Sequence, residues 1–349
     1  MKPGIQYIPF LPLFKFAVSI KNVLYDKKVI PQGKLPVPVI SIGNIVAGGS
    51  GKTPFTIYLA GLLKQTNIKP AILSRGYGRK STGFVLVSDG NVVENDVAIT
   101  GDEPNMIARM LPGVPVAVCE DRIKGGIELF NRFHPDVILL DDAFQHRRLA
   151  RDMDIVLHPA YSDYKYRWML PVGYLREPLS AFNRSHLIIL THGTESQYEK
   201  LEKRITGFLN RQIPIYRLQY KYQLVPLLSD DYNLENIQKS KINAIAVTGI
   251  ANPEQFFEQC RQKNIHLKDT LSYPDHYFFS EEDILRWEKK AQESGVSDII
   301  VTRKDAVKLS LLNHKTSLRI LVLDQIVHVN DENLFLSRLL DLLSIGAFK

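Results

Sequence analysis

VPVISIGNIVAGGSGKTPF, residues Val37–Phe55, is the stretch that decides the fold of this chain. Apolar and β-branched residues lead into a glycine-rich turn ending in Gly51-Lys52-Thr53, and a helical pattern starts at Phe55. Glycines let successive backbone N–H groups converge on anionic oxygens, and the following helix directs its positive end the same way. Lys and Thr side chains at these positions reach terminal phosphates and Mg²⁺. The stretch therefore predicts a nucleotide site.

The loop departs from the strict phosphate-loop pattern G-x-x-x-x-G-K-[ST], because Val46 stands where the pattern has glycine. The remaining glycines still permit the backbone conformations that the turn needs. The alternative is an ordinary glycine-rich connection between a strand and a helix, which the adjacent Lys52 and Thr53 disfavour. We expect the nucleotide to be held by the residues of the turn, namely Gly48, Gly49, Ser50, Gly51, Lys52, Thr53 and Pro54.

Strand-like and helical patterns alternate along the first two thirds of the chain. Strands are predicted at Val37–Ile42, Ala71–Ser74, Val114–Val118, Val137–Leu140, Ile155–Leu157 and Leu187–Leu190. Helices are predicted around Phe55–Gln65, Pro104–Met110 and Ile123–Arg132. Apolar strands separated by helices favour an α/β fold with a mostly parallel sheet, whose ligands bind at the carboxyl ends of the strands.

The length of 349 residues predicts two domains. A second series of strands follows at Ala244–Thr248, Asp298–Thr302 and Leu318–Leu323, with helices at Pro253–Arg261 and Glu281–Ser294. Between the two series, Ile213–Leu227 alternates apolar and polar residues, as extended strands with one exposed side do. We predict an N-terminal helix at 1–30, a phosphate-loop domain at 31–212, a β linker at 213–240 and a smaller α/β domain at 241–349.

The composition is that of a globular protein, with 45% hydrophobic and 23% charged residues. The net charge of +7 favours anionic partners such as nucleotides, phospholipids or nucleic acid without choosing among them. Cys119 and Cys260 form no metal-binding spacing and are interpreted as small core residues in a reducing compartment.

The N-terminal segment IQYIPFLPLFKFAVSIKNVLYDKK, Ile5–Lys28, is apolar, but prolines and lysines interrupt it before it reaches the length of a clean membrane span. From Pro12 on, its polar residues fall on one narrow helical stripe and apolar residues cover the rest. Such a helix either lies in a membrane surface or docks on the core of the protein. The residues alone leave both alternatives open.

Two acidic motifs extend the nucleotide hypothesis. VILLDDAFQHRR, Val137–Arg148, delivers Asp141 and Asp142 at a strand end, where a Walker-B-type carboxylate meets Mg²⁺. Both cannot point inward from a regular strand, so we expect one to ligate the metal and the other to bond a neighbour. In GDEP, Gly101–Pro104, Asp102 is either a helix cap or the base for an attacking hydroxyl.

The chain resembles the tetraacyldisaccharide 4'-kinase family over nearly its whole length. The resemblance rests on GNIVAGGSGKTP (Gly43–Pro54), SRGYGR (Ser74–Arg79), GDEP, EDR (Glu120–Arg122), DDAFQHRRLARD (Asp141–Asp152), LREP (Leu175–Pro178) and YPDHYFF (Tyr273–Phe279), in that order. It implies transfer of the γ-phosphoryl group of ATP, with Mg²⁺, to the 4'-hydroxyl of a tetraacyl glucosamine disaccharide 1-phosphate, in lipid A biosynthesis. It also implies two α/β domains joined by a two-stranded sheet, and an N-terminal helix at the cytoplasmic face of the bacterial inner membrane.

The resemblance also implies roles for individual residues. Asp102 matches the proposed catalytic base, paired with His276, while Lys52 and Arg122 match cationic positions of the site. Thr53, Asp141, Asp142 and Glu103 are the expected metal-side residues, and Tyr77, Asp102, His146 and Arg148 the expected substrate-binding ones. Arg147, Arg148 and Arg151 either serve the 1-phosphate of the acceptor or form a solvated basic face.

Two departures from the family pattern stand out. Ala143 replaces a usual glycine, which questions a positive φ there, and Arg303 in TRKD (Thr302–Asp305) replaces a usual glutamate, which alters a local ion pair.

The main alternative function is a P-loop GTPase or metallochaperone-like NTPase. TRKD argues against guanine reading because it lacks the asparagine of NKxD and its lysine is one position late. A nucleic-acid binder finds no basic and aromatic motif to support it. We expect ATP, the lipid and an anionic membrane surface as partners, no nucleic acid and no obligate protein partner.

Overall fold

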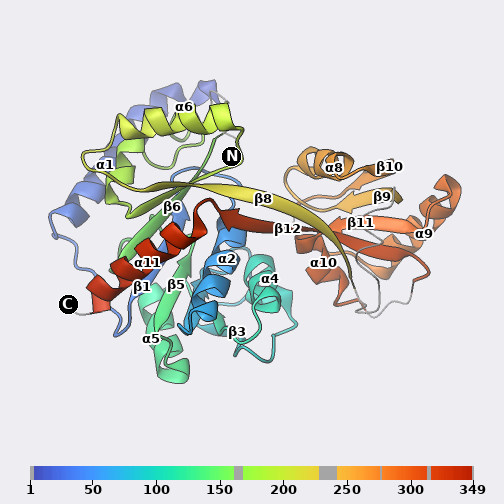
Figure 1. Cartoon of the computed structure of the whole chain (residues 1–349), viewed down its shortest axis with the longest axis horizontal. Coiled ribbons are helices and arrows are strands. Elements are labelled where there is room, and N and C mark those ends of the chain that lie inside the picture. Colours follow the sequence, from blue (N-terminus) through green and yellow to red (C-terminus); the bar gives the residue numbers. More distant parts are fainter. Residues whose placement is uncertain (1–3, 161–167, 228–241, 276, 313–315, 348–349) are drawn as a thin grey trace.

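The computed structural model describes residues 4–160, 168–227, 242–275, 277–312 and 316–347. A larger lobe contains the strand of the glycine-rich loop, and a smaller lobe lies beside it (Figure 1). His276, which the resemblance pairs with Asp102, lies outside the described residues, as does most of the second half of the predicted linker.

One continuous twelve-stranded sheet runs through both lobes, in the order β10-β9-β11-β12-β8-β7-β6-β1-β5-β2-β4-β3. The strands of the larger lobe are β1 (Val39–Asn44), β2 (Pro70–Ser74), β3 (Val85–Ser88), β4 (Val116–Val118), β5 (Val137–Asp141), β6 (Met153–Pro159) and β7 (Leu187–Thr191). Those that follow are β8 (Ile215–Pro226), β9 (Ile242–Thr248), β10 (Ile265–Ser272), β11 (Asp298–Thr302) and β12 (Arg319–Val329). Among the strand pairs of the described residues, only β3–β4 and β8–β12 are antiparallel, so the predicted mostly parallel α/β fold is confirmed.

Helices cover both faces of the sheet (Figure 1). They are α1 (Leu11–Asp26), α2 (Lys52–Gln65), α3 (Val97–Thr100), α4 (Asp102–Met110), α5 (Arg122–Phe133), α6 (Glu195–Thr206), α8 (Pro253–Gln262), α9 (Glu281–Ser294), α10 (Arg303–Leu309) and α11 (Glu332–Ala347). Short 3₁₀ helices occur at Ile5–Phe10 and Leu179–Arg184. Every strand and helix predicted from the sequence is present, whereas β3, β10, α3, α6, α10 and α11 had not been predicted.

The long antiparallel pair β8–β12 runs between the lobes (Figure 1). The half of β12 that starts at Arg319 belongs to the smaller lobe, while Val327 and Val329 pack in the core of the larger one. Phe335 of α11 continues that core and meets Phe55 of α2 edge-on, with ring centroids 6.2 Å apart. The end of the chain therefore packs on the larger lobe, although the sequence placed 241–349 in the smaller domain. The other predicted domain limits stay predictions.

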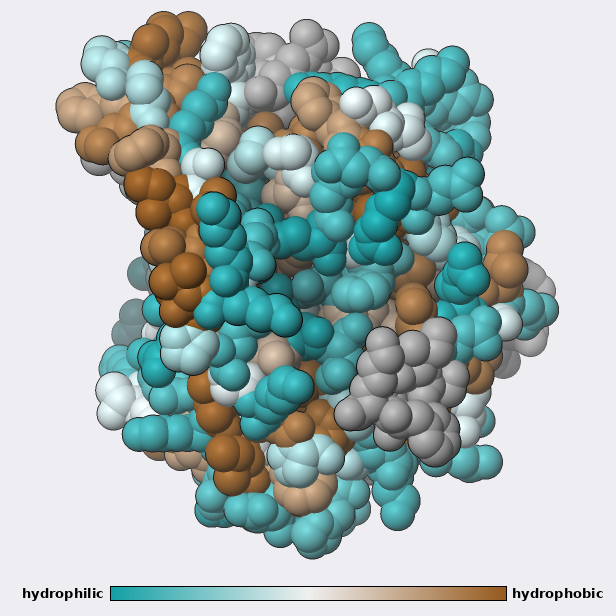
Figure 2. All heavy atoms as spheres, turned by 90° about the vertical axis from the view of Figure 1, so that its left-hand side faces the viewer, coloured by the Kyte–Doolittle hydropathy of each residue, from teal (hydrophilic) through white to brown (hydrophobic). Residues whose placement is uncertain are grey.

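Helix α1 lies along the flank of the larger lobe with its apolar side outward. Its inward face is formed by Leu11, Phe14, Val18, Asn22 and Tyr25, which are buried or half-buried. Leu13 and Phe16 face outward and are 67% and 63% exposed. Figure 2 shows hydrophobic residues gathered in a band along this flank. The helix therefore docks on the protein and still leaves an apolar surface uncovered, so the two alternatives left open by the sequence are not exclusive.

Candidate active site

The glycine-rich loop connects β1 to α2 and is fixed at both ends. Gly48 (φ 109°) and Gly51 (φ 76°) adopt left-handed backbone conformations that favour glycine. Inside the turn, the buried Ser50 hydroxyl accepts a hydrogen bond from Asn44 Nδ2 at 2.6 Å, and its carbonyl accepts one from the Thr191 hydroxyl at 3.1 Å. The loop is thereby tied to the ends of β1 and β7.

Val46 replaces the first glycine of the strict pattern without distorting the turn. It is fully buried and forms an isolated antiparallel bridge with Leu175, in the LREP motif. On either side of it, the Ala47 N–H donates to the Tyr174 carbonyl at 2.7 Å, and the Arg176 N–H donates to the Ile45 carbonyl at 2.7 Å. LREP therefore acts as a short edge against which the loop is held.

A cavity of about 1350 Å³ opens at the carboxyl ends of the strands, between the two lobes. Its walls include residues of α2, α4 and the glycine-rich loop from the larger lobe, and of α8 and α10 from the smaller one. The predicted site residues that the structure describes line this cavity, except the three arginines considered for the acceptor phosphate, Arg147, Arg148 and Arg151. Tyr77 is 83% exposed and stands at the rim.

The two aspartates at the end of β5 have opposite environments. Asp141 is buried and accepts a hydrogen bond from the Thr56 hydroxyl at 3.1 Å; burial, and then the charges of Glu103 and Asp142, raise its pKa to about 7. Asp142 adopts a left-handed backbone conformation (φ 49°) that turns its side chain toward cations.

The carboxylate of Asp142 lies 3.5 Å from Lys52 Nζ and 3.3 Å from Arg176 Nη1. Burial raises the pKa of Asp142, but these two cations outweigh burial and the net pKa lies below its usual value. The positive φ at this corner thus falls on Asp142, and Ala143 needs no glycine in its place.

The donors at this corner fit Mg²⁺. A carboxyl whose pKa is raised by burial, and further by the charges of Glu103 and Asp142, is a place where a cation lowers the electrostatic energy. Within the described ranges, no group of three or more His, Cys, Asp or Glu side chains is spaced to hold a metal alone. Mg²⁺ in nucleotide sites takes one or two protein ligands and completes its shell with phosphate and water oxygens. Thr53, Asp141 and Glu103 suit that arrangement, because all three line the cavity beside the loop.

Asp102 is the first residue of α4, after the N-cap residue Gly101, and is buried. Its carboxylate lies 3.2 Å from Nζ of Lys308, a buried residue of α10. Lys308 also donates to the Tyr277 carbonyl at 3.0 Å and lies 5.6 Å from the ring centroid of Phe278. The sequence analysis missed Lys308, which carries no local motif and meets Asp102 only through the packing of α10 against α4.

Arg122 and His146 also line the cavity, near Asp141. Arg122 opens α5 and is buried; its guanidinium donates to the Cys119 carbonyl at 2.5 Å and the Asp141 carbonyl at 3.4 Å. Burial lowers its pKa to about 10, so it stays cationic at neutral pH. Burial, followed by the charges of Arg122, Arg151 and Arg148, lowers the pKa of His146 to about 4, which keeps the imidazole neutral.

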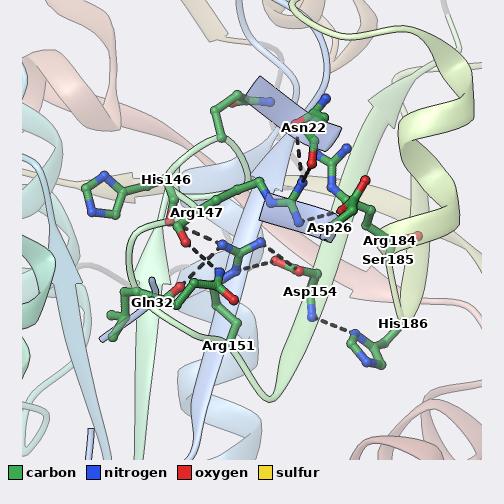
Figure 3. Close-up of polar contacts among 12 residues, drawn as sticks. Asn22, Asp26, Gln32, His146, Arg147, Arg151, Asp154, Arg184, Ser185 and His186 are labelled. Carbon is green, nitrogen blue, oxygen red and sulfur yellow. Dashed lines mark hydrogen bonds and ion pairs between the residues drawn. The ribbon is translucent and has the colours of Figure 1, made fainter. Parts of the chain in front are cut away.

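Two of the three arginines considered for the acceptor phosphate are engaged elsewhere (Figure 3). Arg147 Nη2 pairs with Asp26 of α1 at 2.7 Å, and Arg151 pairs with Asp154 at 3.0 Å. Both arginines have side chains that are at most 9% exposed. They are structural in this chain, and Arg148 alone of the three is exposed.

The TRKD segment does not present a guanine-reading aspartate. Asp305 is fully buried and accepts hydrogen bonds from the hydroxyls of Thr248 and Thr302, both at 2.7 Å. Thr302 caps the start of α10, because its hydroxyl accepts a hydrogen bond from the Asp305 N–H at 3.2 Å. Arg303, which replaces a usual glutamate, pairs with Asp324 of β12 at 2.8 Å, so the altered ion pair has a partner here.

Comparisons with known proteins agree on one family. Residues 5–344 match the model of the family described as Tetraacyldisaccharide-1-P 4'-kinase. A tetraacyldisaccharide 4'-kinase of Syntrophus aciditrophicus is 38% identical over 314 residues, 86% of this chain and 83% of that protein. One of Aquifex aeolicus is 39% identical over 274 residues, 78% of this chain and 82% of that protein.

A solved structure is similar over almost the whole chain. It is the "apo" form of LpxK from Aquifex aeolicus in complex with ATP, with a TM-score of 0.78 and 32% identity. The match covers 97% of this chain and 98% of that chain. None of these matches supports the GTPase or metallochaperone alternative.

Gly51→Ala tests the geometry of the loop. A Cβ at Gly51 would lie 2.8 Å from the Tyr220 hydroxyl, on a backbone with φ 76°. We expect the variant to lose about 1–2 kcal/mol of unfolding free energy and most of its affinity for a fluorescent ATP analogue. The matched control is Gly61→Ala in the interior of α2, where a Cβ meets nothing within 4 Å; it should gain about 0.5–1 kcal/mol. Equal urea midpoints for the two variants would contradict the strain argument.

Proposed function

Because the chain belongs to the tetraacyldisaccharide-1-P 4'-kinase family, it is an ATP-dependent kinase that phosphorylates the 4'-position of the lipid A precursor, and we propose that the cavity between the lobes is its active site. The observation that carries the assignment is the meeting of three groups on one cavity. They are the glycine-rich loop with Lys52, the carboxylates at the end of β5, and Asp102 at the start of α4.

The loop and its lysine bind the donor. Backbone N–H groups of the turn from Gly48 to Thr53 and the N-terminus of α2 face the β- and γ-phosphates of ATP. Lys52, held by Asp142, contacts the γ-phosphoryl group, and Arg122 adds a fixed cation behind the site. These charges stabilise the transferring group without a covalent intermediate.

Asp102 accepts the proton from the acceptor. The oxygen of the 4'-hydroxyl forms a bond to the γ-phosphorus, the bond from that phosphorus to the β–γ bridging oxygen breaks, and ADP leaves. The hydroxyl proton passes to the Asp102 carboxylate, whose direction is fixed by Lys308 at 3.2 Å. His276 remains the proposed partner of Asp102 on the strength of the resemblance, and Tyr77, His146 and Arg148 remain the proposed contacts to the acceptor.

Asp141 is the metal-side carboxylate of the pair in this proposal, together with Thr53 and Glu103. Asp142 pairs with Lys52 and Arg176, whereas Asp141 is buried and feels the negative charges of Glu103 and Asp142. Asp141, Thr53 and Glu103 would hold Mg²⁺, which would supply positive charge beside the transferring phosphates.

Helix α1 places the enzyme on the cytoplasmic face of the inner membrane in this proposal. The helical segment Ile5–Asp26 is long and apolar enough to cross a membrane, and only 6% of its most apolar window is buried in the protein. It docks on the larger lobe along its whole length, however, from Leu11 to Tyr25. A helix docked in this way lies in the interface, with its lysines toward anionic headgroups. ATP reaches this side of the membrane, and the lipid acceptor lies in the same leaflet.

The kinase assignment is tested with γ-labelled ATP and a tetraacyl disaccharide 1-phosphate in mixed micelles. We expect a labelled lipid that carries one additional phosphate, formed only when Mg²⁺ is present. The control acceptor is the same lipid already phosphorylated at the 4'-position, which should take no label. Label transfer to water alone, with no labelled lipid, would contradict the proposal.

Asp102→Asn tests the proton acceptor, because it keeps the size of the side chain and removes the basic carboxylate. We expect kcat to fall by about 10²-fold or more while affinity for ATP stays near normal. Asp89→Ala removes a fully exposed carboxylate far from the cavity and should leave kcat unchanged. If Asp102→Asn turned over normally, Asp102 would be only the acidic first residue of α4.

Leu13→Ser combined with Phe16→Ser tests the membrane surface. Burying a Leu or Phe side chain stabilises by about 1.5–3 kcal/mol, so losing both should weaken sedimentation with anionic vesicles by at least about tenfold. Leu285→Ser on α9 is the control, since Leu285 is 53% exposed on the smaller lobe. Equal loss of binding in both variants, or in neither, would place the membrane contact elsewhere.

A further inference from the structure

Glu177 is a buried carboxylate at the junction of three segments. It is 3% exposed and accepts hydrogen bonds from Arg184 Nη2 at 2.8 Å and Gln145 Nε2 at 3.1 Å. A third donor comes from the N-terminal helix, where Asn22 Nδ2 lies 2.8 Å from Glu177 Oε2. A buried charge needs such partners, because each one lost leaves part of its desolvation uncompensated.

Two routes lead from Glu177 to the phosphate-binding loop. Through the backbone, its neighbour Arg176 pairs with Asp142, which pairs with Lys52. Through Gln145, the same amide nitrogen also donates to the Asn44 carbonyl at 2.7 Å, and Asn44 holds Ser50 of the loop. The position of Glu177 therefore affects both the cation that meets the phosphate and the turn that cradles it.

Helix α1 makes a second set of contacts near the phosphate-binding loop, with Arg147 (Figure 3). The Arg147 guanidinium donates to the Asn22 carbonyl at 3.2 Å and to Asp26 Oδ1 at 2.7 Å, and lies 5.1 Å from the ring centroid of Tyr25. Lys21, one residue before Asn22, donates to the Gln145 carbonyl at 3.2 Å and lines the cavity itself. The polar residues in the last two turns of α1, Lys21, Asn22 and Asp26, thus contact the segment between Asp142 and Arg147, which carries site residues.

We propose that α1 is a positioning element of the kinase site, in which Asn22 and Asp26 hold Glu177 and Arg147 so that Asp142 and Arg176 set the position of Lys52. The inference rests on the proposed function and adds a second role to the membrane helix. Its outward apolar residues contact lipid, while Asn22 and Asp26 at its C-terminal end fix the loop that binds the donor phosphates. Catalysis and membrane contact then depend on opposite sides of one helix and can be separated by substitution.

Asn22→Leu tests the inner face, with Ser19→Leu as the matched control. Both changes place a leucine on α1, but Ser19 is exposed and Asn22 bonds Glu177. We expect Asn22→Leu to bind anionic vesicles at least as well as the unaltered protein, and to lower kcat at least about fivefold, because a hydrogen bond to a charged group is lost. The KM for the lipid should stay unchanged. Ser19→Leu should keep kcat, and Asn22→Gln, which retains an amide donor, should recover part of it.

Asp26→Asn tests the contact between α1 and Arg147 and leaves Glu177 unchanged. The Asp26 side chain is 55% exposed. Like Asn22→Leu, Asp26→Asn should lower kcat, with little change in the melting temperature. The melting temperature is measured for every variant. A normal kcat in both Asn22→Leu and Asp26→Asn, with both folded, would overturn the proposal. A drop in kcat that merely followed loss of vesicle binding would overturn it as well. Failure of the kinase assignment is recognised separately, because the unaltered protein would then label no lipid.

Discussion

The parallel pairing of β1 with β5 is the constraint on which the whole site depends. Its register sets Ile42 opposite Asp141, so both strands end at the same edge of the sheet. The turn that follows β1 and the carboxylates that follow β5 are thereby brought together from segments about a hundred residues apart in the sequence. Neither is a site without the other: the turn supplies N–H groups and Lys52, and β5 supplies the acidic groups that suit Mg²⁺. The left-handed corner at Asp142 then separates the pair, so that Asp142 meets Lys52 while Asp141 stays buried.

The part of the site that the sequence predicted is the part encoded locally. A glycine-rich turn before Lys52, and paired aspartates after an aliphatic run, are short patterns whose chemistry depends on adjacent residues. Val46 marks the limit of such local patterns. The turn accepts a valine in place of glycine because Val46 pairs with Leu175, and only the fold brings these two residues together. Lys308 was missed for the same reason, since it meets Asp102 through helix packing across the two lobes. The return of α11 to the larger lobe could not be predicted either, because the apolar pattern of a helix does not specify which core it joins.

The basic residues after β5 show why charge alone is a poor guide to a binding site. In the sequence, Arg147, Arg148 and Arg151 form one cluster that suits a phosphate. In the structure, two of them are directed into ion pairs with Asp26 and Asp154. Burying an arginine without such a partner is costly, so each buried arginine stays with its carboxylate: Asp26 lies 121 residues from Arg147 in the sequence, and Asp154 only three residues from Arg151. The interpretation of a basic run thus depends on which acidic residues the fold places near it.

Helix α1 combines features that would conflict in a protein surrounded only by water. In water, an outward apolar face does not stabilise the docked helix. Two sets of contacts hold it instead: the packing of Leu11, Phe14 and Val18, and the polar contacts at Asn22 and Asp26. Those polar contacts are short-range and directional, which fixes the rotation of the helix about its own axis. Once that rotation is fixed, Leu11, Phe14 and Val18 face the protein, while Leu13 and Phe16 face outward. The hydrogen bonds that tie α1 to the region of the phosphate loop therefore also determine which of its apolar residues stay uncovered.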